Sequence, residues 1–146
     1  MTTILSFEEQ YNLLTGRIFM YITRFLNQNF KSAGIEITKE QWTVLAVLWK
    51  QDGVSQQVIA DETGRDKPST TRLLDNLEKL GYIERRPDAT DRRINNIYLT
   101  HQGIHAEKKI MKTVTATFDM LSEGISNKEQ ETMRKVFRTI YKNLEK

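Results

Sequence analysis

Residues 66–85 are DKPSTTRLLDNLEKLGYIER, and this stretch decides the fold. Asp66 can accept hydrogen bonds from the free N–H groups that open a helix, and Pro68 suits the first helical turn. Gly81 suits the end of that helix. The residues that share its apolar side are Leu73, Leu74, Leu77 and Leu80. The stretch therefore predicts an amphipathic helix over about 67–80, whose other face is polar.

A β-hairpin is predicted directly after this helix. Residues 82–86 and 94–99 have the pattern of short strands, and PDATD at 87–91 has turn-forming chemistry. Asp91 can fix the tip by accepting hydrogen bonds from turn N–H groups or from an arginine. The arginines that the hairpin is expected to bring together around this turn are Arg85, Arg86, Arg92 and Arg93.

Helices are predicted on both sides of this unit from apolar periodicity and capping residues. Val58 and Ile59 are expected to pack inward, and Gly103 and Gly124 are interpreted as isolated helix stops. Further helices are expected over 7–30, from 38 to about 52, over 55–63, over 101–122 and from 126.

The predicted order along the chain is four helices, two strands and two more helices. This order indicates a mainly α fold with a small β-hairpin wing. This is a winged helix-turn-helix flanked by N- and C-terminal dimerisation helices. We expect a single domain over 1–146, with the DNA-binding lobe at 38–100 and a helical dimerisation layer at 1–34 and 101–146. The predicted dimer-interface residues are Phe7, Tyr11, Leu14, Val136, Phe137, Ile140, Tyr141 and Leu144.

Composition narrows the functional class. The 146 residues contain no cysteine, which excludes disulfides, thiol chemistry and cysteine-based zinc sites. No apolar run approaches the ~20 residues of a membrane helix, and no signal peptide is recognisable, so a cytoplasmic protein is expected. The net charge of +3 only weakly indicates a polyanionic partner, because residues 51–100 carry eight basic and nine acidic side chains.

The polar face of helix 67–80 is a candidate for reading DNA bases. Arg72 is the best candidate for guanine, because its planar fork matches O6 and N7 of that base. The wing arginines could enter a minor groove, and the N-terminus at Ser55 could hold a phosphate. The alternative for each is a solvated surface or an ordinary cap. The predicted DNA-binding residues are Ser55, Gln56, Lys67, Pro68, Ser69, Thr71, Arg72, Asn76, Arg86, Asp91, Arg92 and Arg93.

Residues 66–85, together with DRRINNIYLT at 91–100 and Gly103, resemble the recognition helix and wing of the MarR (multiple-antibiotic-resistance regulator) family. The resemblance implies an obligate dimer on a pseudo-palindromic operator, with recognition helices in major grooves and wings in minor grooves. It also implies that Arg93 is the wing arginine and Asp91 the acid that orients the wing. Pro68 departs from the family pattern, which usually has a small polar residue there.

The resemblance also implies a small aromatic or phenolic effector as a partner. The alternative is that the candidate pocket residues simply fill the core. These residues are Phe19, Ile22, Phe30, Trp42, Leu45 and Trp49. His101 and His105 could share a metal on one helix, but we interpret them as polar surface. We expect no cofactor, and no catalytic constellation suggests an enzyme.

The sequence thus predicts a cytoplasmic, homodimeric, sequence-specific transcriptional regulator, most simply a repressor, whose partners are double-stranded DNA and a second copy of itself. The alternative is a winged-helix protein-interaction module without sequence-specific DNA binding. The near-neutral charge of residues 51–100 favours this alternative, whereas Arg72, Arg92 and Arg93 argue against it.

Overall fold

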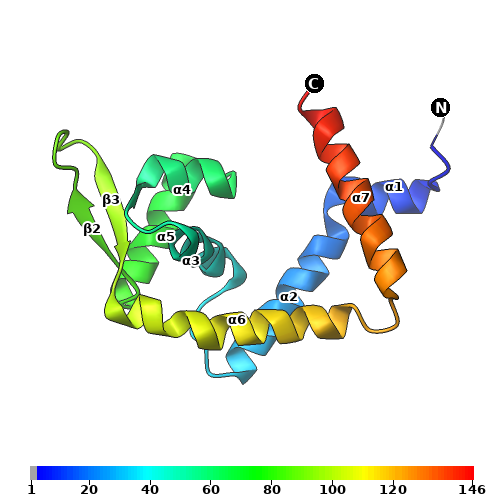
Figure 1. Cartoon of the computed structure of the whole chain (residues 1–146), viewed down its shortest axis with the longest axis horizontal. Coiled ribbons are helices and arrows are strands. Elements are labelled where there is room, and N and C mark those ends of the chain that lie inside the picture. Colours follow the sequence, from blue (N-terminus) through cyan, green and yellow to red (C-terminus); the bar gives the residue numbers. More distant parts are fainter. Residues whose placement is uncertain (1–2) are drawn as a thin grey trace. The chain divides into compact units, whose positions relative to one another are not determined.

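The computed structural model describes residues 3–146, which divide into one unit ending at Val114 and a second from Thr115 to Lys146. The predicted fold class is confirmed: helices dominate, and one small antiparallel sheet forms the wing (Figure 1). In chain order, the elements are α1 (Phe7–Thr15), α2 (Arg17–Ser32), α3 (Lys39–Lys50), β1 (Val54–Ser55), α4 (Gln56–Thr63), α5 (Lys67–Lys79), β2 (Ile83–Pro87), β3 (Asn95–Leu99), α6 (His101–Leu121) and α7 (Asn127–Leu144).

Side-chain caps begin the helices where the sequence predicted them. Ser6, Thr38 and Ser126 each form a reciprocal capping box with the residue three positions later. Ser55 accepts from the N–H of Val58, and Asp66 from the N–H of Ser69. These bonds satisfy N–H groups that a helix leaves free at its start, so they fix where each helix begins.

The single long helix predicted over 7–30 is wrong. Gly16 adopts a left-handed conformation, with φ 67°, and separates α1 from α2. Glycine can take this conformation without the steric cost that a Cβ would add. The apolar spacing continues across the break, which is why periodicity alone did not reveal it.

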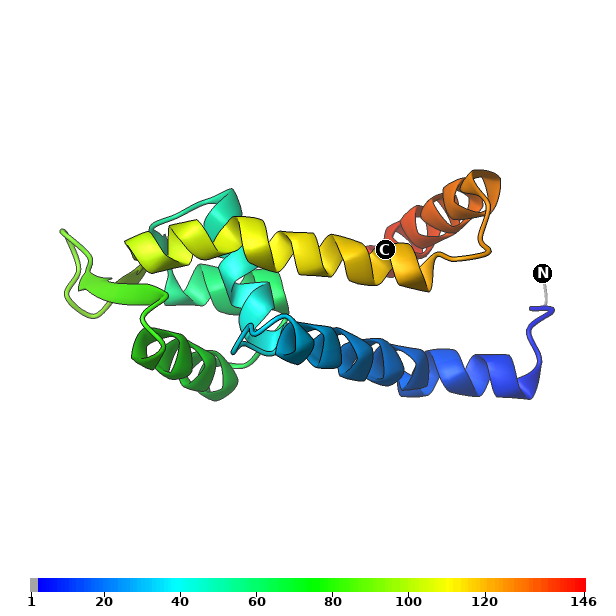
Figure 2. The ribbon, with the colours of Figure 1, turned by 90° about the horizontal axis from the view of Figure 1, so that it is seen from below.

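The wing contains a third strand that the sequence analysis missed. In β1, Val54 pairs with Ile97 of β3, and the strand order is β1-β3-β2. A two-residue strand is too short to show alternation, so its sequence gives no periodic signal. Figure 2 shows that the β2–β3 hairpin projects beyond the helices of its unit.

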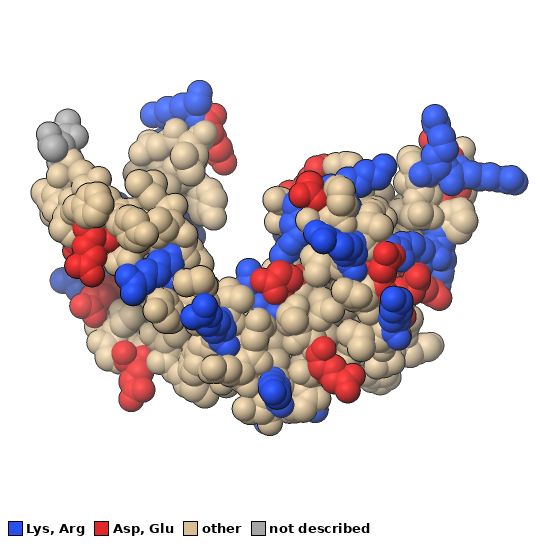
Figure 3. Space-filling view, turned by 180° about the vertical axis from the view of Figure 1, so that it is seen from behind, with Lys and Arg blue, Asp and Glu red and all other residues tan. Residues whose placement is uncertain are grey.

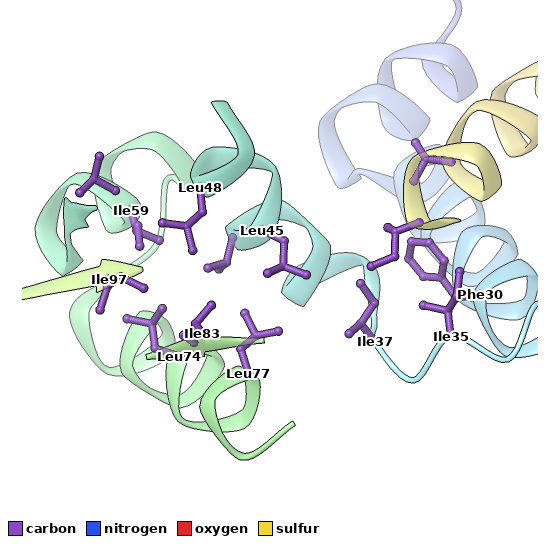
Figure 4. Close-up of a cluster of buried hydrophobic side chains, with 14 of the residues drawn as sticks. Phe30, Ile35, Ile37, Leu45, Leu48, Ile59, Leu74, Leu77, Ile83 and Ile97 are labelled. Atoms are coloured by element: carbon purple, nitrogen blue, oxygen red, sulfur yellow. The ribbon is translucent and has the colours of Figure 1, made fainter. Parts of the chain in front are cut away.

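The core of the first unit forms where α3, α4, α5 and the sheet converge. The side chains that point toward one another there are Leu45, Leu48, Ile59, Leu74, Leu77, Ile83 and Ile97 (Figure 4). Thr70 is also completely buried, and its hydroxyl donates to the carbonyl of Asp66 at 2.9 Å. Val58 was expected to pack inward but is 39% exposed, because α4 turns Ile59 and Ala60 toward the core instead.

The buried cluster continues to the end of α2, the following loop and α6, through Phe30, Ile35, Ile37, Ile110 and Val114. Trp49 joins α3 to α6, since its indole N–H donates to the carbonyl of Gly103 at 3.0 Å. Gly103 is therefore not the helix stop that was predicted. It lies inside α6, where a Cβ would be 2.1 Å from the carbonyl oxygen of Tyr82.

Replacing Gly103 with alanine is expected to lower the free energy of unfolding by about 1–3 kcal/mol, because the backbone at Tyr82 would have to shift. The same change at an unobstructed helix position would raise stability by about 0.5–1 kcal/mol. Urea unfolding of both proteins measures the difference. A Gly103→Ala protein as stable as the parent would contradict this account of the close approach.

Candidate nucleic-acid interface

The exposed face of α5 is set by the opposite, buried face. Thr70, Leu74 and Leu77 are completely buried, so Arg72 and Asn76 are turned to solvent. Arg72 donates to the hydroxyl of Ser69 at 3.3 Å. The Ser69 N–H bond lowers the pKa of Asp66, which keeps this capping carboxylate ionised at the start of the helix. Lys67 and Pro68 are also exposed in the first turn.

Gln56 and Thr71 contact each other rather than both pointing to solvent. The amide nitrogen of Gln56, at the start of α4, donates to the hydroxyl of Thr71 at 2.7 Å. The same hydroxyl donates to the carbonyl of Lys67 at 3.0 Å. The structure therefore gives Thr71 a packing role that the sequence analysis did not anticipate, and it joins α4 to α5.

The turn at the wing tip is organised by Asp88. Its carboxylate accepts from the N–H and hydroxyl of Thr90, from the N–H of Asp91, and from the side-chain amide of Asn96, at 2.7–3.1 Å. These hydrogen bonds lower the pKa of Asp88 to about 2. The sequence alone predicts only a turn here, because the partners of an Asx residue depend on the folded turn.

Asp91 binds Arg93, which confirms the expected role of Asp91 as a hydrogen-bond acceptor. Its carboxylate accepts from the backbone N–H, Nε and Nη2 of Arg93 at 3.0, 3.1 and 3.0 Å. The side-chain bond from Arg93 is the main reason that the pKa of Asp91 is lowered. The Arg93 side chain nevertheless remains 90% exposed, so it is both oriented and accessible.

The four wing arginines do not come together, contrary to expectation. Arg85 pairs with Asp75 and Glu78 of α5, whereas Arg86 lies over the Tyr98 ring at 4.2 Å and pairs with Glu84. Strand alternation explains the separation, because successive residues of β2 face opposite sides of the sheet. The Lys and Arg side chains at the wing tip extend outward at the right of Figure 3.

A hollow of about 390 Å³ connects the wing with the starts of α4 and α5. Its lining is Ser55, Gln56, Gln57, Lys67, Arg93, Ile94 and Asn95. Three predicted groups, the α4 start, the first turn of α5 and the wing arginine, thus share one surface. Gln57, Ile94 and Asn95 were missed, because only the folded hairpin brings its second arm beside α4.

The residues predicted to line an effector pocket have different environments. Phe30 and Leu45 are completely buried in the core, while Phe19 is 56% exposed on α2. Trp42 is half-buried, and its indole N–H points at the sulfur of Met111 at 3.4 Å. Ile22 and Trp49 are also half-buried. A separate hollow of about 600 Å³ lies along α1 and α2, lined by Glu8, Glu9, Asn12, Leu13, Arg17, Ile18 and Tyr21.

The residues predicted for a dimer interface are exposed. Neither α1 nor α7 has a buried residue within the part of the chain that the structure describes. Leu14 on α1 is 85% exposed, and Leu144 on α7 is 76% exposed. The other exposed members are Phe7, Tyr11, Val136, Phe137, Ile140 and Tyr141.

Two other features bear on function within residues 3–146, metal-ligand clusters and membrane-spanning helices. Within that range, no cluster of three or more His, Cys, Asp or Glu side chains could hold a metal ion, although His101 and His105 lie in the first turns of α6. None of the helices there has the length and apolar character needed to cross a membrane.

Comparison with known proteins is consistent with this geometry. Residues 34–94 match the model of the MarR family. An uncharacterised HTH-type transcriptional regulator, YybA of Bacillus subtilis, is 22% identical over 131 residues, covering 90% of this chain and 86% of YybA.

Solved structures share the fold over nearly the whole chain. The transcriptional regulator SlyA is 25% identical, with a TM-score of 0.78 over 89% of this chain and 90% of SlyA. The PcaV transcriptional regulator from Streptomyces coelicolor, solved with its natural ligand, is 16% identical, with a TM-score of 0.79 over 97% of this chain and 98% of PcaV. The exposed α5 face and the arginine-bearing wing thus lie in the segment that matches the MarR family, and the chain shares the fold of winged-helix, DNA-binding transcriptional regulators.

Proposed function

We propose that this protein is a cytoplasmic homodimer that represses transcription by binding a pseudo-palindromic operator. The observation that carries the proposal is the surface shared by the α4 start, the first turn of α5 and Arg93. A recognition helix and a wing on one surface can contact adjacent grooves of the same duplex. The DNA-binding lobe is residues 38–100, and residues 1–34 and 101–146 form the dimerisation layer.

In this complex α5 enters the major groove. Arg72 reads a guanine, and Asn76 and Ser69 contact neighbouring base edges or phosphates. Lys67 and the start of α4 at Ser55 and Gln56 bind phosphates, where free helix N–H groups favour negative charge. Pro68 offers an apolar edge to a thymine methyl. The remaining proposed contacts are Thr71, Arg86, Arg92 and Asp91, the last acting through Arg93.

The wing places Arg93 in the minor groove. A narrow A·T-rich minor groove has an enhanced negative potential that attracts arginine. The exposure of the Arg93 guanidinium supports this role, and its bonds to Asp91 hold it in one orientation. Arg92 is also exposed beside it and is suited to the flanking phosphates.

The large apolar side chains exposed on α1, and those exposed on α7, support a dimer, because pairing with a second copy would remove them from water. A two-fold dimer would present two recognition helices about 34–36 Å apart, one turn of DNA. A small aromatic effector that binds among Phe19, Ile22, Trp42 and Trp49 would release the operator. The PcaV structure with its natural ligand supports a ligand-responsive regulator.

A protein-interaction module remains the second candidate, because residues 51–100 have a net charge of −1. Selection from a random duplex pool at physiological salt separates the two functions. Enrichment of an inverted repeat supports the operator-binding dimer. If no sequence is enriched and binding falls steeply as salt rises, only phosphate attraction is present, and the interaction module is favoured.

Arg93→Ala is expected to weaken binding to the selected operator by about 1–3 kcal/mol, because the minor-groove contact is lost. The melting temperature should not change, since the side chain is 90% exposed. Lys128→Ala, which removes the same charge from α7, is the control. Fluorescence anisotropy titrations measure both variants, and equal affinity of Arg93→Ala and the parent would exclude the wing from the mechanism.

Ile140→Glu is expected to convert the dimer into a monomer, because it places a charge within the apolar stripe of α7. Thr139→Glu adds the same charge next to it, in the polar hollow that Arg134 and Arg138 help to line, and should leave the dimer intact. Sedimentation equilibrium distinguishes the two states. A dimeric Ile140→Glu protein would show that α7 does not form the interface.

The wing tip should lose its order in acid. The pKa of Asp88 is lowered from 3.8 to about 2, so the ionised carboxylate stabilises the turn at pH above about 4. This contribution is lost as the pH falls from about 4 through 2. NMR titration of the Thr90 and Asp91 amides should give a midpoint near pH 2 in the parent protein and no such transition in Asp88→Asn. A parent midpoint near 3.8 would contradict the hydrogen-bond network.

A further inference from the structure

We propose that Arg85 is a positioning residue that locks the wing to the recognition helix, so that Arg93 and α5 engage DNA together. The inference rests on the proposed operator binding. Arg85 is not among the predicted DNA contacts, and its side chain is only 19% exposed. It acts on DNA through the elements it joins.

The contacts of Arg85 form a two-pronged clamp. Its Nη2 lies 2.7 Å from Oδ1 of Asp75, and its Nη1 lies 3.1 Å from Oε1 of Glu78. Because Asp75 and Glu78 are three residues apart, they lie on the same edge of α5. One planar guanidinium in β2 therefore fixes two points along the recognition helix, a geometry that a lysine ammonium could not reproduce.

A second contact holds the same edge of α5 nearer the N-terminus of the helix. Thr71 lies four residues before Asp75 and accepts the 2.7 Å hydrogen bond from Gln56 of α4. The N-terminal half of α5 is thus tied to α4, and its C-terminal half is tied to β2. These two ties oppose rotation of α5 about its own axis, which would change where Arg72 and Asn76 point.

The clamp also reaches the wing tip through the sheet. Arg85 is paired with Ile97 in the β2–β3 register, and Ile97 is completely buried. The hairpin that carries Arg93 is therefore anchored to the core by Ile97 and to the recognition helix by Arg85. Asp75 and Glu78 are 49% and 44% exposed, so solvent screens both ion pairs. The clamp should accordingly affect geometry more than overall stability.

Two variants break the clamp from opposite ends. Arg85→Met removes the cation and keeps the length of the side chain, whereas Asp75→Asn with Glu78→Gln removes both carboxylates from the exposed edge of α5. The first change removes positive charge from the lobe, and the second removes negative charge. Simple attraction to phosphate therefore predicts weaker binding for the first variant and tighter binding for the second.

The decisive measurement is the effect of Arg93→Ala on operator affinity in each background. In the parent, the expected 1–3 kcal/mol corresponds to a loss of about 5- to 150-fold in Kd. If the clamp positions the wing, this loss should shrink to about threefold or less in both clamp variants, despite their opposite charge changes. Glu84→Gln is the matched control in the same strand, because Glu84 pairs with Arg86 and not with α5, and it is not a proposed DNA contact. In that background the Arg93→Ala loss should keep its full size.

Additive effects in either clamp background would overturn the inference, because Arg93 would then reach DNA without the clamp. A loss that shrinks equally in Glu84→Gln would also overturn it, since any perturbation of β2 would suffice. If Arg85→Met does not fold, the Asp75→Asn, Glu78→Gln protein provides the same test. An Arg93→Ala change without effect in the parent itself would instead reject the proposed wing contact, which is a separate failure.

Discussion

The burial of Thr70, Leu74 and Leu77 is the constraint on which the rest of the lobe depends. These side chains have no exposed surface, so they fix the rotation of α5 about its axis. Arg72 and Asn76 face solvent as a geometric consequence, because side chains about half a turn apart point in opposite directions. The hydroxyl of Thr70 can be buried at little cost, since it donates to the Asp66 carbonyl.

The sheet and α6 complete this arrangement around a backbone contact. Gly103 allows α6 to approach the carbonyl of Tyr82, which lies just before β2. The indole of Trp49 binds the carbonyl of that same glycine, so α3, α6 and the base of the wing meet at one point. The wing therefore extends from a rigid base, and its arginine is presented by the scaffold rather than by a loose loop.

Local sequence signals predicted much of this fold, whereas contacts between distant segments could not be read from any local pattern. The capping boxes at Thr38 and Ser126 depend on residues three positions apart, so they could be recognised directly. The pairing of Arg85 with Asp75 and Glu78 depends on how β2 packs against α5, which no local pattern specifies. The same limit applies to the hollow beside Arg93. Side-chain chemistry suggested that the wing arginines bind a minor groove, and the family resemblance singled out Arg93 among them.

The hydrogen bonds around Asp88 have a consequence for the thermodynamics of association. Ordering one backbone residue costs about 1–2 kcal/mol of conformational entropy. In the wing tip, the bonds from Thr90, Asp91 and Asn96 to one carboxylate meet that cost when the chain folds. Little entropy then remains to be lost on docking, and more of the contact energy appears as affinity. A hairpin tip of the same charge but without this carboxylate would dock as a flexible segment and bind more weakly.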